Sequence, residues 1–168
     1  FIIYMNILIC IPTYNEYIHS KLVTDLLNLD LGRRYAIKFT VRFKCGSLIP
    51  RIRNNFISEF IADDSFTHLL FIDSDIYGFT ETLEKMILSQ KDLIGGVYRK
   101  KMKFEEYNIN LLNNIDQTLC DEFPEVKHIP TGLMLISRNV TDLLSWKYPE
   151  RVYFEGQKKR YDFFKCGI

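Results

Sequence analysis

The sequence lacks the features that identify zinc-finger and disulfide-stabilised proteins. Its four cysteines, Cys10, Cys45, Cys120 and Cys166, are far apart and form no Cys-x-x-Cys or Cys/His pair. This spacing argues against a zinc site and predicts free thiols in a reducing compartment. The three histidines form no pattern either, and we assign them no catalytic role.

The chain also lacks a run of apolar residues long enough to span a bilayer. Its apolar opening, FIIYMNILICI, is interrupted by Asn6 and stops at Pro12, well short of the roughly 20 residues of a membrane-spanning helix. The opening has neither the basic start nor the small-residue cleavage site of a signal peptide. We therefore predict a buried strand here and no membrane segment in the chain.

An excess of charge of one sign is absent as well. The formal net charge is +1, which gives no electrostatic reason to expect nucleic acid as a partner. Hydrophobic residues make up 47% of the 168 residues, which is ordinary for a globular protein. No repeat or low-complexity linker divides the chain, so we expect a single domain over residues 1–168.

Strand-like and helix-like segments alternate along the sequence. The apolar pattern predicts strands at 7–11, 36–43, 68–72, 92–98 and 132–137, and helices at 17–29, 51–62, 81–89 and 140–146. Thr80 is the expected N-cap of the third helix, residues 103–127 read as an irregular surface excursion, and the tail from Tyr148 shows no clear period. This alternation predicts an α/β fold, a three-layer α/β/α sandwich with a mostly parallel sheet. Ligands bind such sheets beyond the carboxyl ends of the strands.

Two aspartates, Asp73 and Asp75, follow the apolar run in the segment LLFIDSDI. Residues i and i+2 at a strand end point to the same side, so both carboxylates can approach one ligand. Mg²⁺ or Mn²⁺ commonly binds one or two carboxylates together with phosphate oxygens, and such a cation removes the repulsion between them. The pattern predicts a metal-assisted phosphate site. A turn in which one aspartate merely caps the next helix is the alternative.

Polar residues follow two other predicted strands. In Pro12-Thr13-Tyr14-Asn15 the tyrosine offers a ring on which a flat base can stack, although an ordinary turn capped by Asn15 is the simpler interpretation. In Pro130-Thr131-Gly132 the small residue allows the backbone and a sugar-sized ligand to come close, and a plain turn is again the alternative.

Arginines stand at the start of the second predicted helix. Arg51 and Arg53 are unfavourable there because the helix dipole is positive at its N-terminus, so their position suggests an anionic partner. The guanidinium fork suits a diphosphate. A surface salt bridge with Asp63 or Asp64 is the alternative.

In this order, five segments resemble the nucleotide-sugar glycosyltransferases of the GT-A fold: IPTYNE, SLIPRIRNNFISEFI, THLLFIDSDI, DLIGGVYRKK and HIPTGLMLISR. The likeness spans most of residues 6–138 and is greatest to small viral and bacterial single-domain transferases, including the amino-terminal transferase domain of a chlorella-virus protein. It implies a Rossmann-like GT-A domain that moves sugar from a UDP- or GDP-linked donor to a saccharide or glycoprotein acceptor. It also implies Mn²⁺ or Mg²⁺ as cofactor and a cytoplasmic location, in the host cytoplasm if the protein is viral.

The resemblance implies a role for each matching position. The implied donor-binding set is Pro12, Thr13, Tyr14, Arg53, Asp73, Ser74, Thr131 and Gly132. Its first three members would line the nucleotide pocket, and its last two would lie near the transferred sugar and the acceptor. Asp73 and Asp75 would bind the metal, with Asp75 as the main ligand.

In similar proteins an acidic motif after the segment matching YDFFKCGI supplies the base of an inverting transfer. The chain stops at Ile168, so we expect this base and the end of the domain to lie beyond that residue. Glu155 and Asp162 are the nearest acids upstream, and neither stands in that motif. The catalytic base is therefore unassigned.

Two other functions fit parts of the sequence. A haloacid-dehalogenase-like phosphotransferase also has a DxD motif after an apolar strand, and Ser137 could mimic its second motif. That motif usually comes near the chain start, however, with Thr or Val where Tyr77 stands here. A non-catalytic module that binds nucleotide sugar is the second alternative, favoured by the missing acidic motif.

Overall fold

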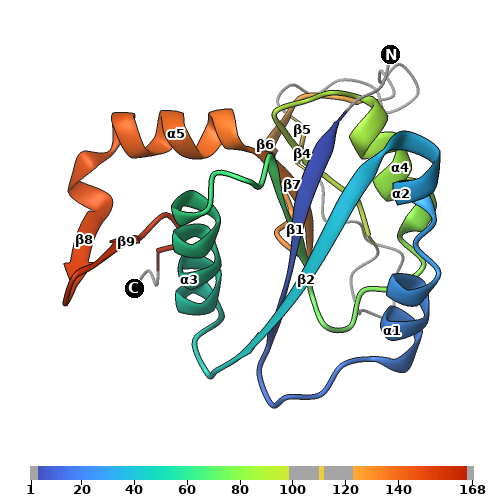
Figure 1. Ribbon diagram of the computed structural model, residues 1–168, viewed down its shortest axis with the longest axis horizontal. Coiled ribbons are helices and arrows are strands. Elements are labelled where there is room, and N and C mark those ends of the chain that lie inside the picture. Colours follow the sequence, from blue (N-terminus) through green and yellow to red (C-terminus); the bar gives the residue numbers. More distant parts are fainter. Residues whose placement is uncertain (1–3, 99–109, 112–122, 166–168) are drawn as a thin grey trace.

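A five-stranded sheet in the order β2-β1-β3-β7-β4 organises the chain (Figure 1). We describe a computed structural model over residues 4–98, 110–111 and 123–165. The sheet strands are β1 Met5–Thr13, β2 Ile37–Cys45, β3 His68–Ile72, β4 Leu93–Gly95 and β7 Leu133–Ser137. β1 pairs in parallel with β2 and β3, whereas β7 runs antiparallel to both β3 and β4. The predicted α/β fold with a mostly parallel sheet is confirmed, with one antiparallel strand within it.

Helices cover both faces of this sheet. Figure 1 shows α1 Ser20–Leu27, α2 Leu31–Tyr35 and α4 Thr80–Leu88 on one face, and α3 Ile49–Ala62 on the other. Successive β1 residues alternate between the two layers: Ile7 and Ile9 pack in the core beneath α1, α2 and α4, and Leu8 packs in the core beneath α3. The continuous apolar run of β1 is thus explained, because a central strand is buried on both faces.

Three segments that carry candidate residues reach the same edge of the sheet. β1 and β3 both end there because they are parallel, and β7 begins there because it is antiparallel to β3, with Ile72 opposite Leu133. The backbone N–H of Asp73 donates to the carbonyl of Gly132 over 2.8 Å, which joins the end of β3 to the start of β7. The edge therefore gathers the residues that follow β1 and β3 and those that precede β7.

Several local predictions were wrong in detail. The first helix begins at Ser20, not residue 17, because the His19 ring accepts a hydrogen bond from the Lys21 N–H and caps it. Phe79, not Thr80, occupies the N-cap of α4, and the short α2 was not predicted.

The C-terminal region forms more regular structure than its pattern predicts. After α5 Arg138–Lys147 and a 3-10 turn at Pro149–Arg151, β8 Val152–Glu155 and β9 Lys158–Tyr161 form a hairpin. Gly156 has a φ of 63° in its two-residue loop, as a type II′ turn requires. A second small pair joins β5 Asn110–Leu111 to β6 Val126–His128, whereas most of 103–127 lies outside the described residues.

Two further findings concern the thiols and the helices of the described residues. Cys10 and Cys45 are free, and burial raises the pKa of the Cys10 thiol; Cys120 and Cys166 lie outside the described residues. No helix in the described part of the chain is long and apolar enough to cross a bilayer.

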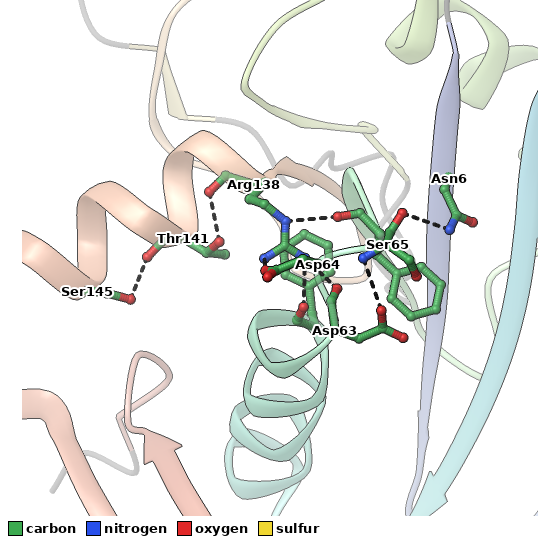
Figure 2. A network of polar contacts seen from close by, with 9 residues as sticks. Asn6, Asp63, Asp64, Ser65, Arg138, Thr141 and Ser145 are labelled. Atoms are coloured by element: carbon green, nitrogen blue, oxygen red, sulfur yellow. Dashed lines mark hydrogen bonds and ion pairs between the residues drawn. The ribbon is translucent and has the colours of Figure 1, made fainter.

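Arg138, at the start of α5, joins three segments (Figure 2). Its Nε donates to the carbonyl of Phe66 over 2.9 Å, and its Nη2 donates to those of Phe60 and Asp63 over 2.8 and 2.7 Å. The guanidinium also stacks on the Phe60 ring, 4.5 Å from its centroid. Arg138 thereby satisfies carbonyls at the end of α3, which a helix leaves without partners.

We predict that Arg138→Met lowers the free energy of unfolding by about 2–3 kcal/mol, because the partly buried carbonyls of Phe60 and Phe66 lose a charged donor. Arg138→Lys should recover only part of this loss, since an ammonium cannot reproduce the planar fork. Urea unfolding measures both values. Arg33→Met is the control because the Arg33 side chain is 93% exposed; an equal loss in that variant would contradict the prediction.

His68 at the start of β3 makes stability depend on pH. Burial lowers the pKa of His68. The negative charge of the nearby Asp92 raises it, but by less than burial lowers it. The unfolded chain therefore binds a proton more readily, so the free energy of unfolding should fall as pH drops below about 6.5 and level off below the folded pKa. His68→Gln should flatten this part of the curve in urea unfolding between about pH 7.5 and 5. Parallel curves for the two proteins would refute the assignment.

Candidate functional site

A pocket of about 250 Å³ opens at the sheet edge where β1, β3 and β7 meet. Its walls are Pro12, Tyr14, Ile49, Arg53, Asp73, Ser74, Asp75 and Thr131. All of these except Ile49 were singled out from the sequence. Ile49 was missed because an apolar residue at a helix start carries no signal that separates a pocket wall from the core.

Arg53 and Asp73 form the charged centre of this pocket. Arg53 is 8% exposed, and its Nη2 lies 2.5 Å from Asp73 Oδ1. Arg53 does not form the alternative surface salt bridge with Asp64, because Asp64 pairs with Arg138. A buried guanidinium needs a counter-charge, so the end of β3 and the start of α3 are held together here.

Two aromatic rings fix the position of this guanidinium. The Arg53 Cζ lies 5.8 Å from the centroid of the Phe71 ring and 5.9 Å from that of Phe164. Its Nε is buried with no hydrogen-bond partner among the described residues. Within the same residues its Nη1 also makes no hydrogen bond, and unlike Nε it is not fully buried. Arg53 therefore keeps a donor for the oxygen of an anionic ligand.

The turn that carries the two aspartates is braced by α1. The carbonyl of Ser74 accepts a hydrogen bond from the His19 N–H over 2.9 Å, and the Gly78 N–H donates to Asp25 Oδ2 over 2.5 Å. Because Phe79 occupies the N-cap of α4, neither Asp73 nor Asp75 caps that helix. The alternative of a simple capping role is thereby removed.

Thr13 and Gly132 differ from the other predicted site residues. Thr13 is buried, its hydroxyl donates to the carbonyl of Lys44 over 3.3 Å, and it is not among the lining residues. Gly132 is not among the lining residues either, and a Cβ added to it would be 2.5 Å from Tyr98 Oη and 2.9 Å from Asp73 Oδ2. Only glycine leaves room for both side chains at this point. Because Tyr98 thus lies beside Asp73, the structure adds it to the candidate site.

The carboxylates suit a cation that is shared with a phosphate. Among the described residues no group of three or more His, Cys, Asp or Glu side chains could hold a metal ion. Mg²⁺ and Mn²⁺ do not need such a cage when a ligand supplies phosphate oxygens. Asp73 is half-buried against Arg53, whereas Asp75 is exposed at the pocket. The carboxylates of Asp73 and Asp75 therefore fit such a cation, and Asp75 is the more accessible of the two.

The fold and the pocket define an α/β protein with a mixed five-stranded sheet of Rossmann type. No protein-family model matches the sequence, and no curated protein matches it. Among solved structures the chain is similar to A197 from STIV, with a TM-score of 0.52 and 17% identity over 82% of this chain and 68% of that chain. At this identity the similarity concerns the fold alone.

We predict that Gly132→Ala lowers the free energy of unfolding by about 1–3 kcal/mol, the usual range for overpacking. The new methyl group would displace the Tyr98 ring and the Asp73 carboxylate. Gly46→Ala is the matched control, since its Cβ would meet only the end of the Ile52 side chain at 3.2 Å. Urea unfolding of both variants checks this, and equal losses would contradict the close approach at Gly132.

Proposed function

We propose that this chain binds a nucleoside-diphosphate sugar at the sheet-edge pocket and belongs to a metal-dependent glycosyltransferase of the GT-A type. The observation that supports this most strongly is the meeting of Arg53, Asp73 and Asp75 in one pocket with Tyr14. A cation held by carboxylates beside a fixed guanidinium complements a diphosphate, which carries two or more negative charges. The exposed Tyr14 ring offers a surface for the base.

The bound cation would supply positive charge to the departing diphosphate. Arg53 would donate to a diphosphate oxygen and hold it in place, since its guanidinium is fixed by Asp73 and two rings. In the transfer, the acceptor oxygen bonds to the anomeric carbon as the bond from that carbon to the diphosphate breaks. The acceptor proton passes to a base that is not assigned among the described residues, and inversion at the anomeric carbon is the expected outcome.

The position of Ser137 disfavours a dehalogenase-like phosphotransferase. Because β7 is antiparallel to β3, Ser137 lies opposite His68, at the far end of β3 from Asp73. At the usual rise per residue, the two ends of β3 lie about 13 Å apart. The Ser137 hydroxyl donates instead to Asp92 over 2.5 Å. It therefore cannot assist a phosphoryl transfer to Asp73.

We predict that Mn²⁺ with UDP or GDP raises the melting temperature by about 5–10 °C at a concentration near 100 times the Kd. Asp75→Asn should abolish this increase, because the variant loses a charged ligand for the cation, and each protein without ligand gives its own reference melting temperature. Differential scanning fluorimetry with and without Mn²⁺ measures the effect.

Asp142→Asn is the matched control, because Asp142 is an exposed aspartate on α5 and lies outside the pocket. It should keep the full temperature increase. If no nucleoside diphosphate gives a metal-dependent increase, donor binding is wrong. If a phosphomonoester instead leaves Asp73 phosphorylated, the phosphotransferase alternative is correct.

A further inference from the structure

A larger pocket, of about 570 Å³, lies beside α3 and is separate from the sheet-edge pocket. It is lined by Arg51, Asn54, Glu150, Arg151, Tyr153, Asp162 and Lys165. Its volume lies within the range of small-molecule sites, roughly 300–1,000 Å³. None of its residues is used by the proposed donor site.

The two arginines at the start of α3 serve different pockets. Arg53 and Ile49, one turn apart, face the sheet-edge pocket, whereas Arg51 and Asn54 face the larger one. Arg51 is exposed and makes no hydrogen bond or ion pair within the described residues. The helix dipole disfavours a cation at this position. An anionic ligand would offset that effect.

The charges of this larger pocket suit a single negative charge. Arg51, Arg151 and Lys165 are cationic, and Glu150 and Asp162 are carboxylates, which leaves one net positive charge. Arg151 and Glu150 make only a long contact of 4.0 Å. A phosphate dianion would meet two carboxylates, whereas a monoanionic carboxylate would balance the net charge.

The other walls offer the groups that bind sugar hydroxyls. Asp162 accepts only one described side-chain hydrogen bond, from Asn54 Nδ2 over 2.8 Å, so its second oxygen can accept from a hydroxyl. The Tyr153 ring is 48% exposed and presents an aromatic face with a hydroxyl at its edge. Carboxylates, an aromatic ring and cations together favour a polyhydroxylated ligand with a carboxylate group.

The segment after β9 connects the two pockets. Asn54 fixes it, because its Nδ2 donates to the carbonyl of Phe164 over 2.9 Å and its Oδ1 accepts from the Phe164 N–H over 2.8 Å. The Phe164 ring then packs against Arg53, the guanidinium of the sheet-edge pocket. The larger pocket therefore lies next to the donor site, with the start of α3 and Phe164 between them.

From this arrangement we propose that the larger pocket binds a saccharide carrying a uronic acid unit. Arg51 and Arg151 bind the carboxylate, while Asp162 and Tyr153 contact the hydroxyls. Under the proposed function, on which this role rests, the ligand is the acceptor of the transferred sugar. Binding itself requires neither the metal nor the nucleotide.

Methyl β-glucuronide and methyl β-glucoside, which differ in the carboxylate, are the probes for this pocket. Ligand-observed NMR titration should show the glucuronide binding about tenfold more tightly, as a charge-assisted contact predicts. Arg51→Gln should remove this preference. Arg33→Gln, at an arginine whose side chain is 93% exposed and lies outside both pockets, should keep it.

Equal affinity for the two sugars, or a preference that survives Arg51→Gln, would overturn the proposal. Inorganic phosphate that displaces the glucuronide at equal concentration would also overturn it, since the pocket would then bind a simple anion. Asp75→Asn should leave glucuronide binding unchanged while abolishing the effect of Mn²⁺ and UDP. Failure at the larger pocket and failure of the donor site are therefore separate results.

Discussion

The contact between Arg53 and Asp73 is the constraint on which the sheet-edge pocket depends. A guanidinium that is almost completely buried needs a carboxylate beside it, and removing one partner of such a pair typically costs about 3–5 kcal/mol. The pair holds the first turns of α3 against the end of β3. Phe71 and Phe164 enclose it, so the carboxyl end of β3, α3 and the segment after β9 are all held at one point. The Arg53 guanidinium and the Asp73 carboxylate are thereby held in place without a ligand. Groups that are already ordered would lose less entropy when a ligand binds.

The antiparallel direction of β7 adds a second constraint at the same edge. In an all-parallel sheet, the residues before this strand would lie at the opposite end, far from Asp73. Here they arrive beside it, and Gly132 lets the Asp73 and Tyr98 side chains approach its backbone. The Asp73 and Tyr98 side chains therefore occupy the space beside Gly132 and join the start of β7 to the pocket wall.

Much of the fold was predictable from the sequence because long elements carry strong patterns. β3 has the predicted bounds of residues 68–72, and α3 differs by only two residues at its start. Short elements escaped prediction. α2 has five residues, too few to show a helical period, and the β8–β9 hairpin alternates weakly because most of its side chains are exposed. The His19 cap was missed because histidine is not among the usual capping residues.

The sequence by itself determined the class of fold and every lining residue of the sheet-edge pocket except Ile49. Parallel strands deliver the segments that follow them to one edge, so strand position alone indicates which residues meet. Only the tertiary structure decided which arginine serves which pocket, because Arg51 and Arg53 are two residues apart and project from different sides of α3. Likewise, only the structure revealed the larger pocket, since its walls come from α3 and from residues about 100 positions later in the chain. Contacts over such sequence separations follow from packing, and no local pattern records them.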